Sequence, residues 1–407
     1  MDKKMGGALS SHPTFHCHYK PCMVKKILKC KMLARYLQFN IVITCKKLFM
    51  KEPVFIGAGT RGAKMVGNEF QPYMDFHGKT CLEYVVEAAM RARSVGDIYI
   101  WGDKKTLEKI LAEHVRQYRH RLVIVEERQN IVESFFFTFL NYISRDSNTL
   151  RSMVTNWNSI KNINWSQLEE HFKKTDQWEK QVNVIVSDTP LISSYELDYL
   201  IENKNHDADL VIGRTVRKDY KNILETLNEI PDREKSIKNF YTYRIGDKDI
   251  PLIVNSFIAG KPLKLNENIW NISGNFYENR TIIAGRKKNL RKIASNLLLF
   301  KRLFFPKHFG INLYSYVKRG LAVFYLNNAF KAIVKSKSDS IYYRDLRKIY
   351  ESIYTLVNLT IEYDLSHCFG SAFDIDTEYE ADFIRRNFFA LQNICYEYYK
   401  NHDGPEL

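Results

Sequence analysis

Three short groups of residues in this 407-residue chain have types and spacing that suit phosphate or metal binding. The first is Gly57-Ala58-Gly59-Thr60-Arg61-Gly62, which directly follows the β-branched run Val54-Phe55-Ile56. Glycines let backbone amides approach a phosphate closely, and the Arg61 guanidinium adds a charged fork. Neither the Walker pattern nor the complete dinucleotide fingerprint is present. Phosphate binding and an ordinary strand-to-loop turn therefore both remain open for this loop.

The other two groups supply carboxylates. Asp188 follows the apolar run 182–186, and Pro190, two residues later, cannot continue a strand ladder. Asp374 and Asp376 lie two residues apart far downstream, so on an extended segment their side chains share one side. Carboxylate oxygens suit a hard cation such as Mg²⁺. An Asp at a strand tip also serves as an N-cap or turn residue, and a lone Asp-x-Asp is a weak signal.

The elements that must position these groups alternate in type from residue 50 onward. Short apolar, β-branched runs predict strands, and apolar residues at helical spacing predict helices. Ser193 and Glu196 form a capping-box pattern before the last helix. The alternation predicts an α/β, Rossmann-like fold with a mainly parallel sheet and helices on both faces, in which ligands bind beyond the carboxyl ends of the strands. The expected strands are 54–56, 97–101, 122–125, 182–186 and 209–213, and the expected helices are 79–92, 106–118, 129–143 and 195–204.

Taken together and in order, these residues resemble the MobA-like NTP transferase group, which includes sugar-1-phosphate nucleotidylyltransferases and cytidylyltransferases. The resemblance covers about residues 50–215, and 360–390 locally. The residues that carry it are Gly57-x-Gly59-Thr60-Arg61, a following Pro72, Gly78-Lys79-Thr80-Cys81-Leu82-Glu83-Tyr84, Asp188-x-Pro190-Leu191, and Asp374-x-Asp376-Thr377. It implies a GT-A-like nucleotidyltransferase fold.

The resemblance also implies a role for each matching residue. The loop of Gly57, Ala58, Gly59, Thr60 and Arg61 would hold the triphosphate of the nucleotide. Asp188 would be the first Mg²⁺ ligand and Asp376 the second, with Asp374 as the neighbouring candidate. The chain departs from the family at Gln71, which stands where a lysine usually neutralises the leaving pyrophosphate. Arg61 or Lys64 would then supply that charge from within the loop.

The activity implied is Mg²⁺-dependent nucleotidyl transfer from an NTP to a sugar- or polyol-phosphate, with release of pyrophosphate. The β-rich region 216–285 would bind the acceptor, with Arg244 and Asn255 as candidate contacts. Two other functions stay open. A GT-A-like glycosyltransferase would use a nucleotide sugar, although its Asp-x-Asp normally follows the mid-chain strand, where this chain has only Asp188. A non-catalytic relative would bind nucleotide or a membrane.

The net charge of +15 comes from two segments. Residues 1–49 hold ten Lys and Arg against the single acid Asp2, and residues 286–337 hold thirteen with no acid. This concentration indicates local electrostatic contacts and argues against a nucleic-acid-coating protein. The expected domains are a basic extension at 1–49 or an upstream start before Met50, a nucleotidyltransferase core at 50–285, a basic helical insert at 286–345, and a C-terminal part of the core at 346–403.

The composition of 286–337 predicts helices that lie on an anionic membrane surface, because its cations alternate with clustered Leu and Phe. Two alternatives remain. The apolar residues could pack on the core while the cations stay solvated, or the segment could bind nucleic acid, for which it has no recognisable module.

Cysteine usage and hydropathy bear on location. Four of the seven cysteines fall within residues 1–49, which does not resemble a disulfide framework, and no apolar run is long enough to span a bilayer. The expected location is cytoplasmic, with peripheral attachment at the inner membrane surface. His16, Cys17, His18 and Cys22 lack the second half of a zinc module.

Overall fold

The chain divides into two units, residues 1–50 and 51–407. A computed structural model describes parts of the second unit. The described residues are 51–60, 65–143, 164–216, 227, 240–245, 248–265, 317–326, 328, 340–343, 351–352, 354–356, 360–366 and 370–401. The expected domain boundaries stay predictions.

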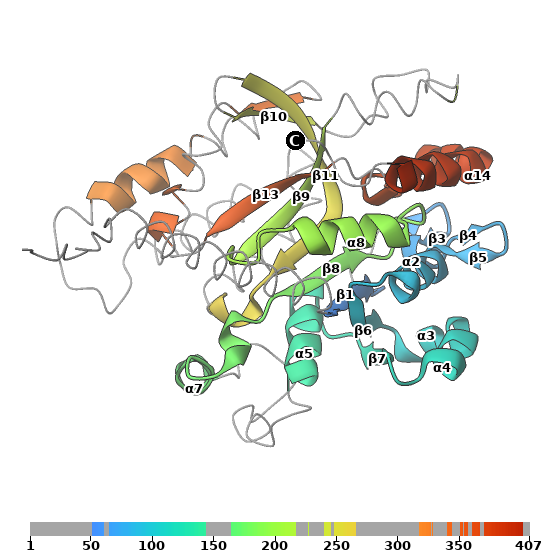
Figure 1. Ribbon diagram of the computed structural model, residues 1–407, viewed down its shortest axis with the longest axis horizontal. Helices are drawn as coiled ribbons and strands as arrows, with labels where there is room; N and C mark the ends of the chain where they lie inside the picture. The colour runs from blue at the N-terminus through green and yellow to red at the C-terminus, as the bar shows by residue number, and fades with distance from the viewer. Residues whose placement is uncertain are drawn as a thin grey trace, which may run out of the picture. The chain divides into compact units, whose positions relative to one another are not determined.

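A nine-stranded sheet forms the centre of the described structure (Figure 1). β1 pairs in parallel with β6 and β8, and β6 pairs in parallel with β7. β11 runs antiparallel to β8, β9 and β10, while β9 and β10 pair in parallel with β13 and β12. The strands are β1 (Glu52–Ala58), β6 (Val95–Gly102), β7 (Leu122–Glu126), β8 (Val182–Val186), β9 (Leu210–Val216), β10 (Phe240–Ile245), β11 (Lys248–Gly260), β12 (Ser340–Tyr343) and β13 (Ile361–Ser366).

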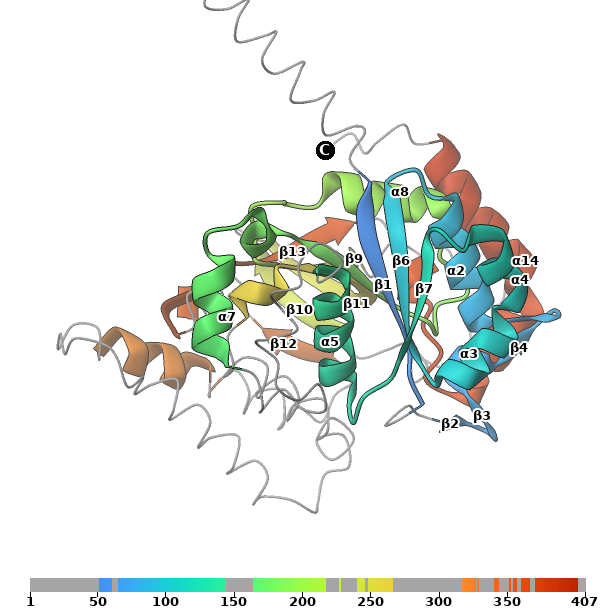
Figure 2. The ribbon, with the colours of Figure 1, turned by 90° about the horizontal axis from the view of Figure 1, so that it is seen from below.

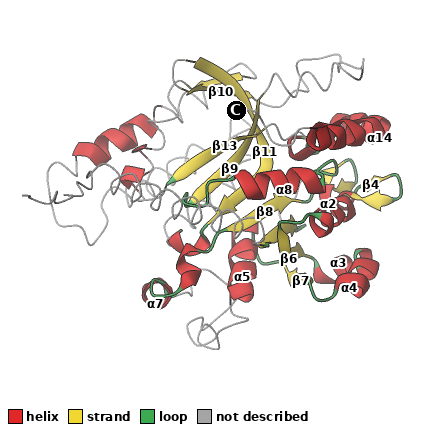
Figure 3. Cartoon of the chain, in the orientation of Figure 1, coloured by secondary structure: helices red, strands yellow, loops and turns green. Residues whose placement is uncertain are grey.

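Helices cover both faces of this sheet (Figure 2). On one face α2 (Cys81–Arg91), α3 (Lys104–Ile110), α4 (Ala112–Tyr118) and α8 (Ser194–Asn203) share a core with the buried residues Val54 and Ile56 of β1. On the other face α5 (Ile131–Ile143) and α7 (Trp165–Phe172) pack against Phe55 of the same strand. Alternate residues of β1 thus face opposite cores, as expected for a strand buried on both sides. The predicted α/β class, with a mainly parallel sheet and helices on both faces, is confirmed (Figure 3).

Two predicted helices differ from the structure. The single helix expected at 106–118 is two helices, because the fully buried Leu111 leaves the helical conformation with φ −96° and ψ 15°. The helix expected from residue 79 begins at Cys81. Lys79 and Thr80 instead form β5, which pairs with β4 (Asp75–Phe76), and the Thr80 side chain caps α2. His77 and Gly78 turn this hairpin with φ values of 55° and 86°.

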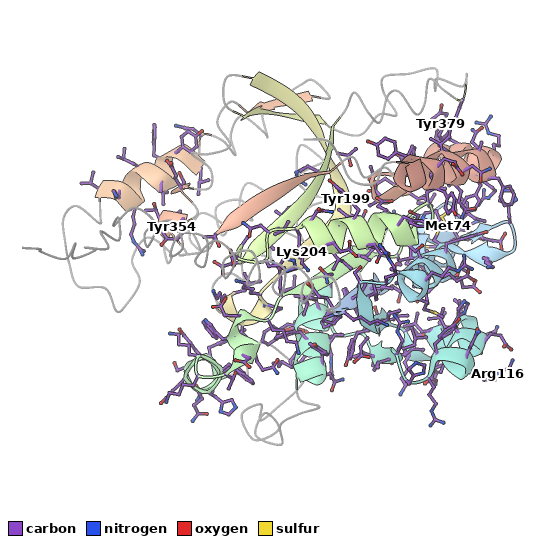
Figure 4. All side chains as sticks on the ribbon, in the orientation of Figure 1. Met74, Arg116, Tyr199, Lys204, Tyr354 and Tyr379 are labelled. Atoms are coloured by element: carbon purple, nitrogen blue, oxygen red, sulfur yellow. The ribbon has the colours of Figure 1, made fainter. Side chains whose placement is uncertain are left out.

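The C-terminal helix α14 (Glu378–Asn401) packs against the N-terminal part of the core. A third apolar cluster joins its Phe388 and Leu391 to Met74, Phe76 and Cys81. Met74, labelled in Figure 4, lies in this region between α14 and α2. Because Asp376 lies two residues before α14, this packing brings the end of the chain to the loops that follow β1.

The opposite, amino-terminal end of β1 is fixed by a buried ion pair. Lys204, just after α8, donates to the carboxylate of Glu52 and to the side-chain oxygen of Asn183. Asn183 in turn donates to Glu52 at 3.0 Å and to the Pro53 carbonyl at 3.1 Å. Burial lowers the pKa of Lys204, which the nearby Glu52 charge opposes. This network joins α8, β1 and β8 at the end of the sheet away from the candidate site.

Little of the expected basic insert can be compared with the structure. Residues 286–316 and 329–337 lie outside the described residues, and residues 317–326 form a helix. On it Val317, Leu321 and Phe324 are 54%, 62% and 65% exposed. Among the described residues, no helix has the length and apolar character required to cross a bilayer.

Candidate active site

The glycine loop begins inside β1, and packing accounts for both of its first glycines. A Cβ added at Gly57 would lie 2.6 Å from the Trp101 ring, and one added at Gly59 would lie 2.6 Å from a carboxylate oxygen of Glu127. The Trp101 ring leaves no room for a side chain at Gly57, whereas a side chain at Gly59 would require the end of the Glu127 side chain to move. Gly57, Ala58, Gly59 and Thr60 are described, whereas Arg61 and Lys64 lie outside the described residues.

Glu127, directly after β7, fixes the root of this loop. Its carboxylate is 6% exposed and accepts the Thr60 N–H and the Thr60 hydroxyl, both at 2.9 Å. Tyr73 adds a bond from its hydroxyl to the Ala58 carbonyl at 2.9 Å, and burial, with the Glu127 charge, raises the pKa of Tyr73. The carboxylate already engages the Thr60 amide, so a bound phosphate must find its donors elsewhere in the loop. The sequence analysis missed Glu127.

The two chain segments that carry the predicted acids lie side by side. The Ile375 N–H donates to the Asp188 carbonyl at 3.1 Å. Asp374 and Asp376 are half-buried and flank Ile375, which is fully buried. Asp188 is half-buried too. The chain fold therefore brings all three expected metal-ligand candidates to one edge of the sheet.

Asp376 lies just before the first residue of the helix α14, and Asp188 acts on the first residue of the helix α2. Thr377 and Glu380 cap α14: the Glu380 N–H donates to Thr377 Oγ1 at 3.2 Å, and the Asp376 N–H donates to Glu380 at 2.8 Å. Burial raises the pKa of the thiol of Cys81, the first residue of α2, and the Asp188 charge raises it further. The amino end of a helix favours a negative charge nearby.

Gln71 contacts the same acidic segment from the first half of the chain. It lies in η1 (Gln71–Tyr73), is 6% exposed, and its side-chain amide donates to the Ile375 carbonyl between Asp374 and Asp376. The hairpin of β2 (Met65–Val66) and β3 (Glu69–Phe70) approaches there as well, because a Cβ added at Gly67 would lie 3.0 Å from Glu378. The role of Gln71 in nucleotide binding stays a prediction.

Glu196 is a second buried carboxylate that the sequence analysis did not assign to the site. Ser193 caps α8 as predicted, accepting the Glu196 N–H at 3.1 Å. The Glu196 side chain, 0% exposed, also reaches across to η6 (Gly370–Ala372), where it accepts the Ser371 N–H at 2.8 Å. Burial raises its pKa to about 7. The residues that it holds lead directly into Asp374.

The two acceptor candidates lie at different places on the β10–β11 hairpin. Phe257 pairs with Ile185, so Asn255 comes two residues beyond the last pair, toward the carboxyl end of β8 and Asp188. Arg244 pairs with Asp249 near the hairpin turn. Asn255 comes six positions after Asp249, which is roughly 20 Å of extended strand. On backbone position Asn255 is the nearer candidate, and both contacts stay predictions.

Magnesium binding by these acids stays a prediction. Among the described residues, no three His, Cys, Asp or Glu side chains form a ready-made metal site. Magnesium at nucleotide sites is commonly bound by one or two carboxylates together with substrate phosphates. Two carboxylates, from Asp188 and from the Asp374–Asp376 segment, match that requirement.

Comparison with known proteins adds little to this geometry. No protein-family model matches the sequence, and no curated protein matches it. Among solved structures, a hypothetical transferase from Thermus thermophilus is 13% identical with a TM-score of 0.43, covering 81% of this chain and 99% of its own. A CMP:2-keto-3-deoxy-manno-octonic acid synthetase complexed with CTP is 10% identical with a TM-score of 0.33, covering 84% and 99%.

A further similar structure is 4-diphosphocytidyl-2C-methyl-D-erythritol synthase from Anaerococcus prevotii. It is 14% identical with a TM-score of 0.31, covering 65% of this chain and 87% of its own. We infer no activity from similarities at this level. The α/β class stated above rests on the strand order of this chain.

Proposed function

We propose that this chain is a Mg²⁺-dependent nucleotidyltransferase that joins an NTP to a sugar- or polyol-phosphate and releases pyrophosphate. One observation carries the proposal: the hydrogen bond from the Ile375 N–H to the Asp188 carbonyl, which brings the two predicted acids together at the carboxyl end of β8. The glycine loop leaves the neighbouring parallel strand β1 at the same edge. A nucleotide at this edge would lie where open α/β sheets bind their ligands.

Each part of the edge has a distinct task in the proposed reaction. Asp188 and Asp376 would hold Mg²⁺, with Asp374 adjacent, and the ion would supply charge stabilisation at the reacting phosphate. Residues 61–64 would contact the triphosphate, because Thr60 is engaged by Glu127. Arg61 and Lys64 would carry the positive charge that Gln71 does not. The protein aligns and neutralises charge without a covalent step.

The proposed step is an in-line displacement. An oxygen of the acceptor phosphate forms a bond to the α-phosphorus of the NTP, and the bond from that phosphorus to the bridging oxygen of the β-phosphate breaks. The electron pair leaves with pyrophosphate, so neither an oxidant nor an additional co-reactant is required. A glycosyltransferase using a nucleotide sugar would instead break a bond at the sugar carbon and release no pyrophosphate.

The test measures pyrophosphate release. Each of the four NTPs is combined with each acceptor from a panel of sugar and polyol phosphates, with and without Mg²⁺. We expect release that requires one NTP, one acceptor and Mg²⁺. Arg61→Ala should weaken NTP binding more than acceptor binding. No release with any pair, together with hydrolysis or transfer from a nucleotide sugar, would favour the glycosyltransferase. Nucleotide binding without turnover would favour a non-catalytic relative.

We also propose that the helix at residues 317–326 contacts an anionic membrane surface. Its exposed Val317, Leu321 and Phe324 follow one another at spacings of four and three residues, so they share one helix face. Lys318 and Arg319 lie in the same helix. An apolar face accompanied by cations is the combination that binds the interface of anionic bilayers.

Vesicle sedimentation tests this second proposal. We expect binding to vesicles that contain phosphatidylserine but not to neutral phosphatidylcholine vesicles, with binding weakened by added salt. Leu321→Ser with Phe324→Ser should abolish it, whereas Tyr354→Ser, also at an exposed aromatic residue, should not. Equal sedimentation of the double variant would exclude this helix face as the contact.

A further inference from the structure

The backbone that precedes the two downstream acids is a tight, buried turn. Gly370, Ser371 and Ala372 form η6, and the Phe373 N–H donates back to the Gly370 carbonyl at 3.2 Å. All of these residues and Ile375 are buried. Asp374 and Asp376 therefore extend from a segment whose placement is set by what η6 rests on.

That turn rests on the beginning of α8. The Glu196 carboxylate accepts the Ser371 N–H at 2.8 Å, and Gly370 lies directly against it. A Cβ added at Gly370 would lie 2.5 Å from Glu196 Oε2 and 2.3 Å from the Leu191 carbonyl. Only glycine permits this approach. Because Leu191 lies three residues after Asp188, the same short stretch carries the first acid and supports the segment that carries the other two.

Stability alone does not explain a charged group in this position. Glu196 is 0% exposed, and burial of a carboxylate opposes folding unless its hydrogen bonds compensate. Its effect on α8 as a first-turn acid would be obtained equally from an exposed side chain. A buried carboxylate that crosses to another element can fix that element with a charge-assisted hydrogen bond.

We propose that Glu196 is a positioning residue: it holds the backbone of η6 on α8 so that the Asp374–Asp376 segment stays beside Asp188. The role rests on the nucleotidyl transfer proposed above for its effect on turnover. Its structural part, the attachment of residues 370–376, does not depend on that reaction. The residues around the carboxylate are Ser193 of α8, Gly370 and Ser371 of η6, and Cys395 of α14.

Three variants separate positioning from ordinary stabilisation. Glu196→Ala removes the acceptor, Glu196→Gln keeps an acceptor oxygen for Ser371, and Gly370→Ala disturbs the same contact from the opposite side. One variant acts as a control on α8: Glu202→Gln makes the same chemical change at an exposed residue of this helix, 3.9 Å from Arg93.

Each folded variant is measured in three ways: hydrogen–deuterium exchange of peptides covering 370–376, Mn²⁺ affinity with a non-hydrolysable NTP analogue, and pyrophosphate release as a function of Mg²⁺ concentration. We expect faster exchange in 370–376 and a loss of about 10- to 100-fold in metal affinity for Glu196→Ala and Gly370→Ala, as for other residues that orient metal ligands. Glu196→Gln should recover most of both.

The control Glu202→Gln should leave exchange in 370–376 and metal affinity unchanged. Unchanged exchange and unchanged metal affinity in folded Glu196→Ala or Gly370→Ala would overturn the proposal. Failure of the wild-type protein to release pyrophosphate would instead count against the proposed function, and the exchange measurement would still decide the positioning role.

Discussion

A buried glutamate holds each side of the candidate site, Glu127 the glycine loop and Glu196 the segment that leads to Asp374 and Asp376. The two sides differ in how many described contacts hold them. On the glycine-loop side, Glu127 accepts two bonds, and both come from Thr60. On the acidic side, described contacts are distributed along the segment: Glu196 binds Ser371, and Ile375 is held through both its N–H and its carbonyl, by Asp188 and Gln71.

This difference matches the tasks that the two sides would perform. Carboxylates that share a small cation must be held at fixed separation, because Mg²⁺ demands near-ideal octahedral geometry. A loop that binds a triphosphate mainly needs to present amides and cations, and its root alone has to be fixed. We therefore expect changes on the acidic side to alter metal dependence and changes on the loop side to alter nucleotide affinity.

The largest effect is expected from the acids themselves. Asp188→Asn and Asp376→Asn should each lower turnover by about two to three orders of magnitude, because each removes a charge aimed at the developing transition state. Both residues are half-buried and lie at the edge of the sheet, so the melting temperature should change little. Pyrophosphate release and thermal unfolding are the measurements. Normal turnover in both variants would show that Asp188 and Asp376 do not bind the metal. The expected difference between an acidic, metal-binding side and a nucleotide-binding loop side would then not hold.

The next effect concerns the pH dependence of stability on the acidic side. Burial raises the pKa of Glu196 from 4.5 to about 7. Ionisation of this group therefore costs more in the folded than in the unfolded state, so its contribution to stability is present below pH 4.5 and is lost as the pH rises toward 7. At full extent the loss is roughly 3 kcal/mol.

Glu196→Gln should remove that loss. Guanidinium unfolding at pH 4.5 and at pH 8 should show that the variant gains about 3 kcal/mol relative to wild type between the two values. Other carboxyls, such as Glu179, whose pKa is lowered by lysine partners, also make stability depend on pH. Their contribution is the same in both proteins, so it cancels when the unfolding free energy of wild type is subtracted from that of the variant. Parallel pH profiles would show that Glu196 titrates normally and is less isolated from water than its position indicates.

Sequence patterns predicted most of the sheet because its strands are buried on both faces. The expected strand 182–186 coincides with β8, because four of its five residues are β-branched and apolar. Its polar residue, Asn183, is buried and donates to the Pro53 carbonyl. The sequence pattern could not predict the roles of Glu127 and Glu196 in the same way. Glu196 fits a capping box, and Glu127 follows an exposed strand end. Each of these local patterns explains the presence of a glutamate without any role at the site. Their function depends on Ser371 and Thr60, which only the folded chain brings near.

On the loop side we expect a smaller effect, confined to nucleotide binding. Glu127→Ala leaves the half-buried Thr60 N–H without its acceptor, which should weaken NTP affinity about tenfold. Glu127→Gln retains an acceptor oxygen and removes a negative charge near the triphosphate, so its affinity should match or exceed that of wild type. Glu126→Ala, at an exposed neighbour, is the control. Calorimetric titration of the nucleotide without metal measures the effect. A loss of Mn²⁺ affinity in Glu127→Ala would contradict the expectation that changes on the loop side alter nucleotide affinity alone.

The smallest effect is expected at Gln71, where the two sides meet. Its buried amide donates to the Ile375 carbonyl, so Gln71→Leu should leave that oxygen without its donor and lower turnover a few-fold, with a cost of about 1 to 3 kcal/mol in stability. Gln71→Lys discriminates between two roles. If this position contacts the leaving pyrophosphate, as the resembling family's lysine does, a restored charge should raise turnover. If Gln71 instead supports the acidic segment, the ammonium must be desolvated at a site only 6% exposed, and turnover should not rise above wild type. We expect the second outcome, and steady-state rates at saturating Mg²⁺ for the two variants would decide it.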